Sequence, residues 1–227
     1  MKKIVIVLGC GRSGTLYASK VFQALGYCVG HEVLQHDGIS SWYLVVDSIW
    51  KDFLYEIKVK NKIYENREFY FIHLLRNPLE VIRSMYLCEV STKRKALDFV
   101  REHIPQFKLE QKSILFTTEW WLYWNERIEK NFPIDRTIRV EDLSKENLLE
   151  NISKDLDIKF SNNMLSRIKS FGSKVHTIDS KVYNELSQTC YKKYLLQGIT
   201  LGAIRIESSM IADRLKRKAI NYGYILD

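Results

Sequence analysis

Residues 4–15 read IVIVLGCGRSGT, and this stretch determines the expected fold. Ile4–Leu8 is a continuous apolar run, nearly all β-branched, which is typical of a strand covered on both faces of a parallel sheet. Apolar residues then recur at helical spacing from Tyr17 to Leu25, and Gly26 follows as a helix stop. The opening therefore predicts a strand, a glycine-rich loop and a helix.

A second strand–turn–helix pattern follows later in the chain. Phe69–Leu75 is again a dense apolar run, broken by His73. Asn77 then stands at an N-cap position, with Pro78 at the first helical position and Glu80 completing a capping box. The strand, turn and helix of the opening are thus repeated.

The remaining elements extend this alternation. We expect a short strand at Tyr27–Gly30, mostly helical structure over Trp42–Ile57, a helix opened by a Thr117 cap, a strand at Thr137–Val140, and a long helix from about Leu201 to Tyr222. Alternating strands and helices indicate an α/β fold: three layers, resembling P-loop NTPases, with a central, mainly parallel sheet flanked by helices. A single domain over residues 1–227, with a mainly helical C-terminal third, is expected.

Composition narrows the range of partners. The formal net charge is +8, which suits anionic ligands, but no motif that reads DNA or RNA is present. The four cysteines are scattered without a C-x-x-C pair, which excludes a zinc or disulfide framework and fits a reducing cytoplasm. No apolar run approaches the roughly 20 residues of a membrane span. We therefore expect a cytoplasmic protein without a nucleic-acid or membrane partner; its oligomeric state cannot be read from the sequence.

The loop after the first strand indicates phosphate binding. A glycine-rich turn between a buried strand and a helix aims free backbone N–H groups at one point, and the helix dipole adds to this anion site. Gly9 and Gly14 have the spacing of an ATP-type loop, G-x-x-x-x-G-K-[ST], but Thr15 stands where the lysine is expected. The positive charge lies inside the loop, at Arg12, which suits a nucleotide with one 5′-phosphate.

Two motifs together resemble the sulfotransferases that use 3′-phosphoadenosine 5′-phosphosulfate (PAPS). Their 5′-phosphosulfate loop ends in [RK]-S-G-T, matched by Arg12–Thr15, and their second signature is R-[ND]-P with a serine eight positions after the arginine. Here that signature is LLRNPLEVIRSMY, with Arg76 and Ser84. A weaker likeness is RVEDL at residues 139–143, so the resemblance covers about residues 4–143.

The resemblance implies a co-substrate and the residues that hold it. PAPS would be the sulfuryl donor, 3′-phosphoadenosine 5′-phosphate (PAP) the product, and no metal would be needed. The residues implied for the 5′-phosphosulfate are Gly11, Arg12, Ser13, Gly14 and Thr15. Those implied for the 3′-phosphate are Arg76 and Ser84. Arg12 would also stabilise the charge that develops on the leaving oxygen.

The stretch VGHEVLQHDG, residues 29–38, supplies candidates for the catalytic base. Sulfotransferases that modify proteins and polysaccharides carry a catalytic glutamate at a similar place, and Glu32 lies twenty positions beyond Arg12. Sulfotransferases of small phenols and steroids use a histidine that is placed later in the chain. His31, next to Glu32, is the alternative base here, or it is structural or a hydrogen-bond partner. In an extended segment the two side chains would point to opposite sides, so that only one could face the sulfur. A solvated Glu32 without a role is the third possibility, and His36 and Asp37 are reserve candidates.

Several groups of aromatic or basic residues can be interpreted either as structural or as part of a binding site. Trp120, Trp121 and Trp124 suit a helix core better than an adenine platform. The run Arg214–Lys218 suits a solvated helix face better than a docking patch. The acceptor, a hydroxyl or an amine with a carbohydrate among the candidates, would be chosen by variable segments at residues 42–66 and 92–117. There Lys93, Arg94, Lys95 and Arg101 fit either an anionic glycan or a solvated helix, and later in the chain Lys174 and His176 could close over the cofactor.

Three alternatives to a sulfotransferase remain. The first is a small P-loop kinase, against which the missing lysine and the lack of an aspartate-bearing strand end for magnesium both argue. The second is a non-catalytic nucleotide- or glycan-binding module on the same fold, because fold resemblance alone never proves activity. The third is two unrelated strand–helix turns whose arginines are surface charges.

Overall fold

The computed structural model describes residues 2–60, 64, 66–91, 95–104, 113–171 and 198–226. Contacts divide the chain into two compact units. The first consists of Met1–Arg76 and Asn125–Lys174, and the second of Asn77–Trp124 and Val175–Asp227. Each unit has its own helices, and the single domain expected over residues 1–227 stays a prediction.

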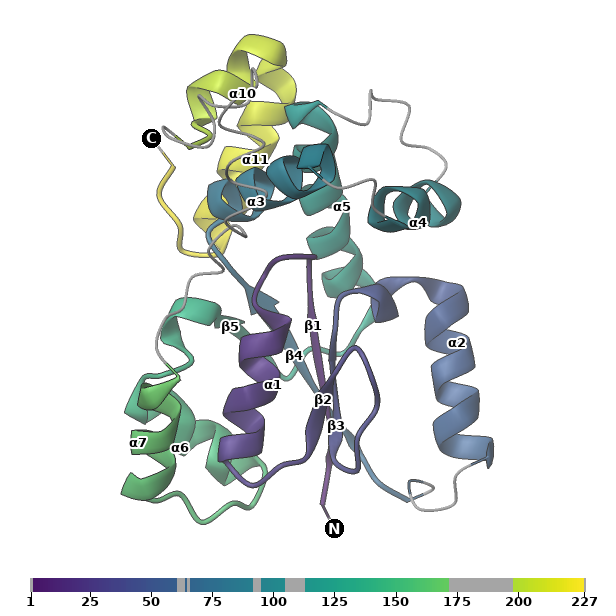
Figure 1. Cartoon of the computed structure of the whole chain (residues 1–227), viewed down its shortest axis with the longest axis vertical. Helices are drawn as coiled ribbons and strands as arrows, with labels where there is room; N and C mark the ends of the chain where they lie inside the picture. The colour runs from purple at the N-terminus through teal and green to yellow at the C-terminus, as the bar shows by residue number, and fades with distance from the viewer. Residues whose placement is uncertain are drawn as a thin grey trace. The chain divides into compact units, whose positions relative to one another are not determined.

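The first unit is built on a five-stranded parallel sheet (Figure 1). Its strands are β1 (Ile4–Gly9), β2 (Val29–His31), β3 (Gly38–Ser41), β4 (Phe69–Leu75) and β5 (Arg136–Arg139). They lie in the order β2-β3-β1-β4-β5, and all four pairings are parallel. β1 is central, and the side chains of Ile4–Leu8 are fully buried, as expected from their apolar run.

Helices α1 (Thr15–Ala24), α6 (Glu146–Asp155) and α7 (Asn162–Ser170) cover one face of this sheet (Figure 1). Their inward side chains pack with alternate residues of the strands, such as Val5 and Val7 of β1, in one buried apolar cluster. The cluster holds α1 on the sheet directly after the loop that follows β1.

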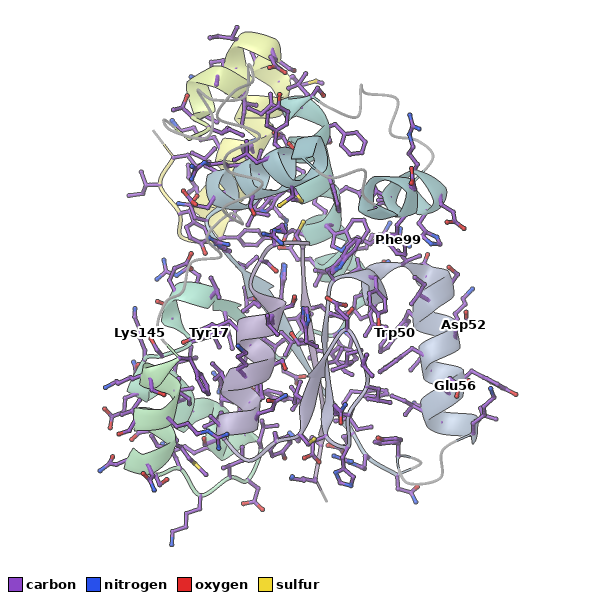
Figure 2. The ribbon with its side chains drawn as sticks, in the orientation of Figure 1. Tyr17, Trp50, Asp52, Glu56, Phe99 and Lys145 are labelled. Carbon is purple, nitrogen blue, oxygen red and sulfur yellow. The ribbon has the colours of Figure 1, made fainter. Side chains whose placement is uncertain are left out.

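Helix α2 (Asp47–Tyr55) covers the opposite face. Its Trp50 side chain points toward the sheet, whereas Asp52 points outward (Figure 2). The Trp50 ring packs against Phe71 of β4 and against Phe132, with ring centroids 5.8 and 5.1 Å apart. Helices therefore flank both faces of a parallel sheet, and the three-layer α/β fold expected from the sequence is confirmed.

The described part of the second unit is mainly helical. Its helices are α3 (Pro78–Ser91), α4 (Lys95–His103), the larger part of α5 (Ile114–Asn131), α10 (Leu201–Glu207) and α11 (Ser209–Asn221). The side chains of Trp120, Trp121 and Trp124 are buried, as expected for a core. The long C-terminal helix is interrupted at Ser208, whose hydroxyl accepts a hydrogen bond from the Ile211 N–H at 3.4 Å and caps α11.

Two strands differ from expectation. β2 begins at Val29 rather than at Tyr27 and ends one residue later than expected. β3 was not expected, because Ile39 is its only strongly apolar residue. Gly38, the first residue of β3, approaches β1 so closely that a Cβ atom would lie 2.0 Å from the Val5 carbonyl oxygen, so that a side chain would not fit there.

The helical segments expected from the sequence are helical in the structure, but α5 begins at a different residue than expected. Residues 42–57 form the turn η1 (Tyr43–Val45), α2 and the start of the π-helical turn η2 (Glu56–Lys60), and a further turn, η4, spans Val140–Asp142. Helix α5 begins at Ile114 rather than after a Thr117 cap. Ser113 caps it instead, accepting a hydrogen bond from the Phe116 N–H at 3.0 Å. The Thr117 hydroxyl donates to the Ile114 carbonyl inside the first turn, an alternative that the sequence pattern did not distinguish.

Candidate active site

The loop between β1 and α1 has the backbone of an anion site. Arg12 and Gly14 both adopt the left-handed conformation, with φ of 70° and 99°. Helix α1 begins at the next residue, and its cap, Gly14, gives no side-chain hydrogen bond to the N–H groups of the first turn. Those groups and the helix dipole can therefore act on a bound anion. The predicted segment Gly11–Thr15 forms this loop and the first residue of α1.

The conformation of Gly14 gives a testable result. A Cβ atom there would lie 2.7 Å from Val140 Cγ2. The left-handed backbone of Gly14 is a second source of strain for any residue with a side chain. We expect Gly14→Ala to lower the free energy of unfolding by about 2 kcal/mol, measured by urea denaturation. Gly26→Ala is the matched control, since Gly26 is also left-handed but a Cβ would meet nothing within 4 Å; about 1 kcal/mol is expected. Equal losses would contradict the close packing of the loop against Val140.

Ser13 lies at the centre of the loop. Its N–H donates to the Cys10 carbonyl at 3.0 Å, and its side chain is 1% exposed. The Ser13 Oγ is buried and has no hydrogen-bond partner among the residues that the structure describes. A Cβ at Gly9 would lie 2.3 Å from this oxygen, so the glycine makes room for it. A buried hydroxyl without a partner costs about 1–3 kcal/mol, and the loop therefore fits a ligand oxygen at Ser13.

Arg76 lies beside the loop, and its role in holding a 3′-phosphate stays a prediction. It follows the last residue of β4, and its Nη1 donates to the Arg12 carbonyl at 3.2 Å. The neighbouring Asn77 caps α3 as expected, because its Oδ1 accepts a hydrogen bond from the Leu79 N–H at 3.0 Å. Ser84 lies on α3 in the second unit, and its role stays a prediction.

A row of polar side chains leads from the loop to the candidate base. The Thr15 Oγ1 is 3.1 Å from His31 Nε2, and the same nitrogen is 3.4 Å from Glu32 Oε1. The Ser40 Oγ of β3 donates to the Thr15 carbonyl at 2.8 Å and fixes the start of α1 on the sheet. The structure therefore brings Thr15, at the end of the loop, and both base candidates together.

The chain turns at Glu32, which corrects one premise of the sequence analysis. An extended segment would have sent His31 and Glu32 to opposite sides of the strand. Instead Glu32 has a φ of 59° and ends β2, and its N–H donates to the Ser40 carbonyl at 3.0 Å. This left-handed residue brings its side chain round to that of His31. The two candidates are neighbours in space rather than exclusive alternatives.

A small set of donors around β3 and η1 holds Glu32 in place. The Ser41 Oγ donates to Glu32 Oε2 at 2.6 Å, and the Tyr43 hydroxyl donates to the Glu32 carbonyl. Burial raises the pKa of the Glu32 carboxyl to about 7, although hydrogen bonds from Ser41 and from the Trp42 backbone oppose this. A carboxyl that titrates near neutral pH is suited to accept a proton at that pH.

The fold was compared with known proteins. No family model matches the sequence, and no curated protein matches it either. A mouse sulfotransferase, SULT7A1, whose crystal structure is complexed with PAP, is structurally similar: the TM-score is 0.50 at 12% sequence identity, covering 97% of this chain and 87% of the mouse chain. The chain has a sulfotransferase-like fold. At this identity the likeness shows the fold alone, and membership of the family stays a prediction.

The reserve base candidates lie at the other end of the sheet. Asp37 precedes β3, and its carbonyl accepts a hydrogen bond from the Val5 N–H near the start of β1. Its carboxylate is buried and pairs with Lys2 at 2.8 Å and Arg67 at 3.2 Å. Although burial opposes it, hydrogen bonds from Lys2, the Cys28 N–H and His36 lower the pKa of Asp37 to about 2. Asp37 and His36 are therefore part of a structural ion cluster rather than of this site.

Sequence reasoning missed the residues that support the base. Ser40, Ser41 and Tyr43 hold Thr15 and Glu32, and they lie in or just after the unexpected strand β3. Polar residues after a short strand carry no pattern that would have shown this role. Lys93, Arg94, Lys174 and His176 lie outside the described residues. Within the described part of the chain, no helix has both the length and the apolar character needed to cross a membrane.

Proposed function

We propose that this protein transfers a sulfuryl group from PAPS to a hydroxyl or amine acceptor and releases PAP. The loop amides, Ser13 and Thr15 would hold the 5′-phosphosulfate together with Arg12, and Arg76 and Ser84 would hold the 3′-phosphate. Glu32 would take the acceptor's proton.

One observation carries this proposal. A half-buried carboxyl with a near-neutral pKa lies within two side-chain contacts of a phosphate-type loop, through His31 and Thr15. Sulfuryl transfer needs both parts at one place, because the acceptor must lose a proton on one side of the sulfur while charge develops on the leaving phosphate on the other. The sulfotransferase-like fold supports the same assignment.

The roles follow from the chemistry of the step. Glu32 removes the proton of the acceptor O–H or N–H as that atom attacks sulfur. The bond between sulfur and the bridging oxygen breaks, and its electron pair stays on the phosphate. Loop N–H groups and Arg12 stabilise this charge. A general base is worth about 10² to 10⁴ in rate.

Calorimetric titration with PAP, AMP and ADP, without magnesium, tests the donor. We expect PAP to bind most tightly, and Arg76→Ala to weaken PAP binding about 10- to 100-fold while leaving AMP binding nearly unchanged, because AMP lacks the 3′-phosphate. Arg217→Ala, at an exposed position on α11, is the matched control and should change neither affinity. Equal binding of the nucleotides would overturn the proposed donor, and the kinase alternative should then be tested with ATP and magnesium.

A further inference from the structure

The position of His31 is explained neither by a role as the base in place of Glu32 nor by a role as a simple hydrogen-bond partner. Its Nε2 atom lies between two oxygens, Thr15 Oγ1 at 3.1 Å and Glu32 Oε1 at 3.4 Å. The Glu32 Oε1 is buried and has no hydrogen-bond partner among the described residues, while the other carboxyl oxygen is held by Ser41 at 2.6 Å. Oε1 therefore faces a single ring nitrogen at close range.

Oε1 and Nε2 can contact each other favourably in two protonation states. A protonated carboxyl can donate to the Nε2 atom of a neutral ring that carries its hydrogen on Nδ1, and an Nε2–H group can donate to the carboxylate. The raised pKa of Glu32 fits the first state near neutral pH. At the other oxygen, Thr15 can donate its hydroxyl to Nε2 or turn it to a ligand at the loop.

We infer that His31 and Glu32 hold one proton between them, and that binding of the phosphosulfate group at the loop draws this proton onto His31. The imidazolium then contacts the departing phosphate, and Glu32 is left as the carboxylate that receives the acceptor's proton. This inference rests on the proposed function and makes His31 a second catalytic residue instead of a rival base.

The protons of the sulfuryl transfer are accounted for by Glu32 and His31 alone. The acceptor's proton goes to Glu32 and from there to solvent, so that one proton is released per turnover. The proton on His31 is not transferred; it donates a hydrogen bond to a phosphate oxygen as the bond to sulfur breaks. No further reactant is needed.

The other ionisable groups on the elements around the pair are Cys10 and Arg12 in the loop, Tyr17 and Lys20 on α1, Tyr43 after β3 and Arg76 after β4. Burial raises the pKa of Cys10 and of Tyr17, and burial with the nearby charge of Glu32 raises that of Tyr43. Proton uptake near pH 8 that is lost when His31 is replaced can therefore be assigned to the pair.

Calorimetry of PAP binding in buffers of different ionisation enthalpy measures this uptake. With the pKa of Glu32 at about 7 in the free protein, binding that raises the pair's affinity for a proton about 10- to 100-fold gives an uptake of about 0.4 to 0.8 proton at about pH 8. His31→Gln should at least halve the uptake while PAP still binds. His36→Gln, the same change at the far end of the sheet, should leave it unchanged.

A second readout needs no variant. In wild-type protein with ¹⁵N-labelled histidines, one of the five histidines should become protonated at both ring nitrogens when PAP is added at about pH 8. PAP binding without proton uptake, or uptake that persists in His31→Gln, overturns the inference and leaves the proposed function standing. A failure of PAP to bind overturns both.

Discussion

Replacing Glu32 with glutamine should lower the kcat of sulfuryl transfer by about 10² to 10⁴-fold. Glutamine has the shape of glutamate and can still accept the hydrogen bond from Ser41, so the backbone and the loop should keep their positions. It cannot take a proton from the acceptor. The affinity for PAP should therefore change little, because the loop and Arg76, rather than Glu32, would hold the nucleotide.

Release of PAP from PAPS in the presence of simple phenols, sugars and amines measures this rate, and calorimetry measures the affinity. Glu68→Gln is the matched control, because Glu68 is exposed and lies just before β4. An unchanged kcat in Glu32→Gln would assign the base to His31. Loss of PAP binding would instead make Glu32 part of the nucleotide site. If wild-type protein binds PAP but transfers to no acceptor, the non-catalytic module is the better description.

The fold was predictable because its central elements have strong local patterns. The apolar run Ile4–Leu8 and the glycine-rich loop after it specify a buried strand and a helix start without long-range information. The second strand–turn–helix pattern, with Arg76 at its turn, is equally plain. The structure places this arginine at the loop. Parallel strands end at one edge of a sheet, so two such turns on adjacent strands meet there.

The contacts that hold Glu32 were not predictable, because they join residues in different elements of the sheet. β3 has little apolar character, and the close approach of its Gly38 to β1 appears only when the sheet is assembled. The left-handed backbone of Glu32 likewise reversed the expected relation between His31 and Glu32. Predictions from sequence periodicity assume a regular backbone, and they are wrong where a single residue adopts a different backbone conformation.

The free energy of unfolding should show the cost of keeping Glu32 in this site. Burial raises the pKa of its carboxyl from 4.5 to about 7, so the folded chain keeps a proton that the unfolded chain has already released. Stability from this group is fully present below pH 4.5 and is lost as the pH rises to about 7. At about 1.4 kcal/mol per pKa unit, the loss is at most about 3.5 kcal/mol.

Glu32→Gln carries no charge and avoids this loss. We therefore expect the variant to be more stable than the wild type by up to about 3.5 kcal/mol at about pH 8, and equally stable near pH 4.5. Urea denaturation at the two pH values measures the difference, and Glu68→Gln should show none. A variant no more stable at high pH would mean that the carboxyl is hydrated and ionises normally, which would remove the physical basis for its role as a base at neutral pH. A higher free energy of unfolding together with a lower rate of sulfuryl transfer would show that the ionised carboxyl of Glu32 destabilises the fold but is needed for activity.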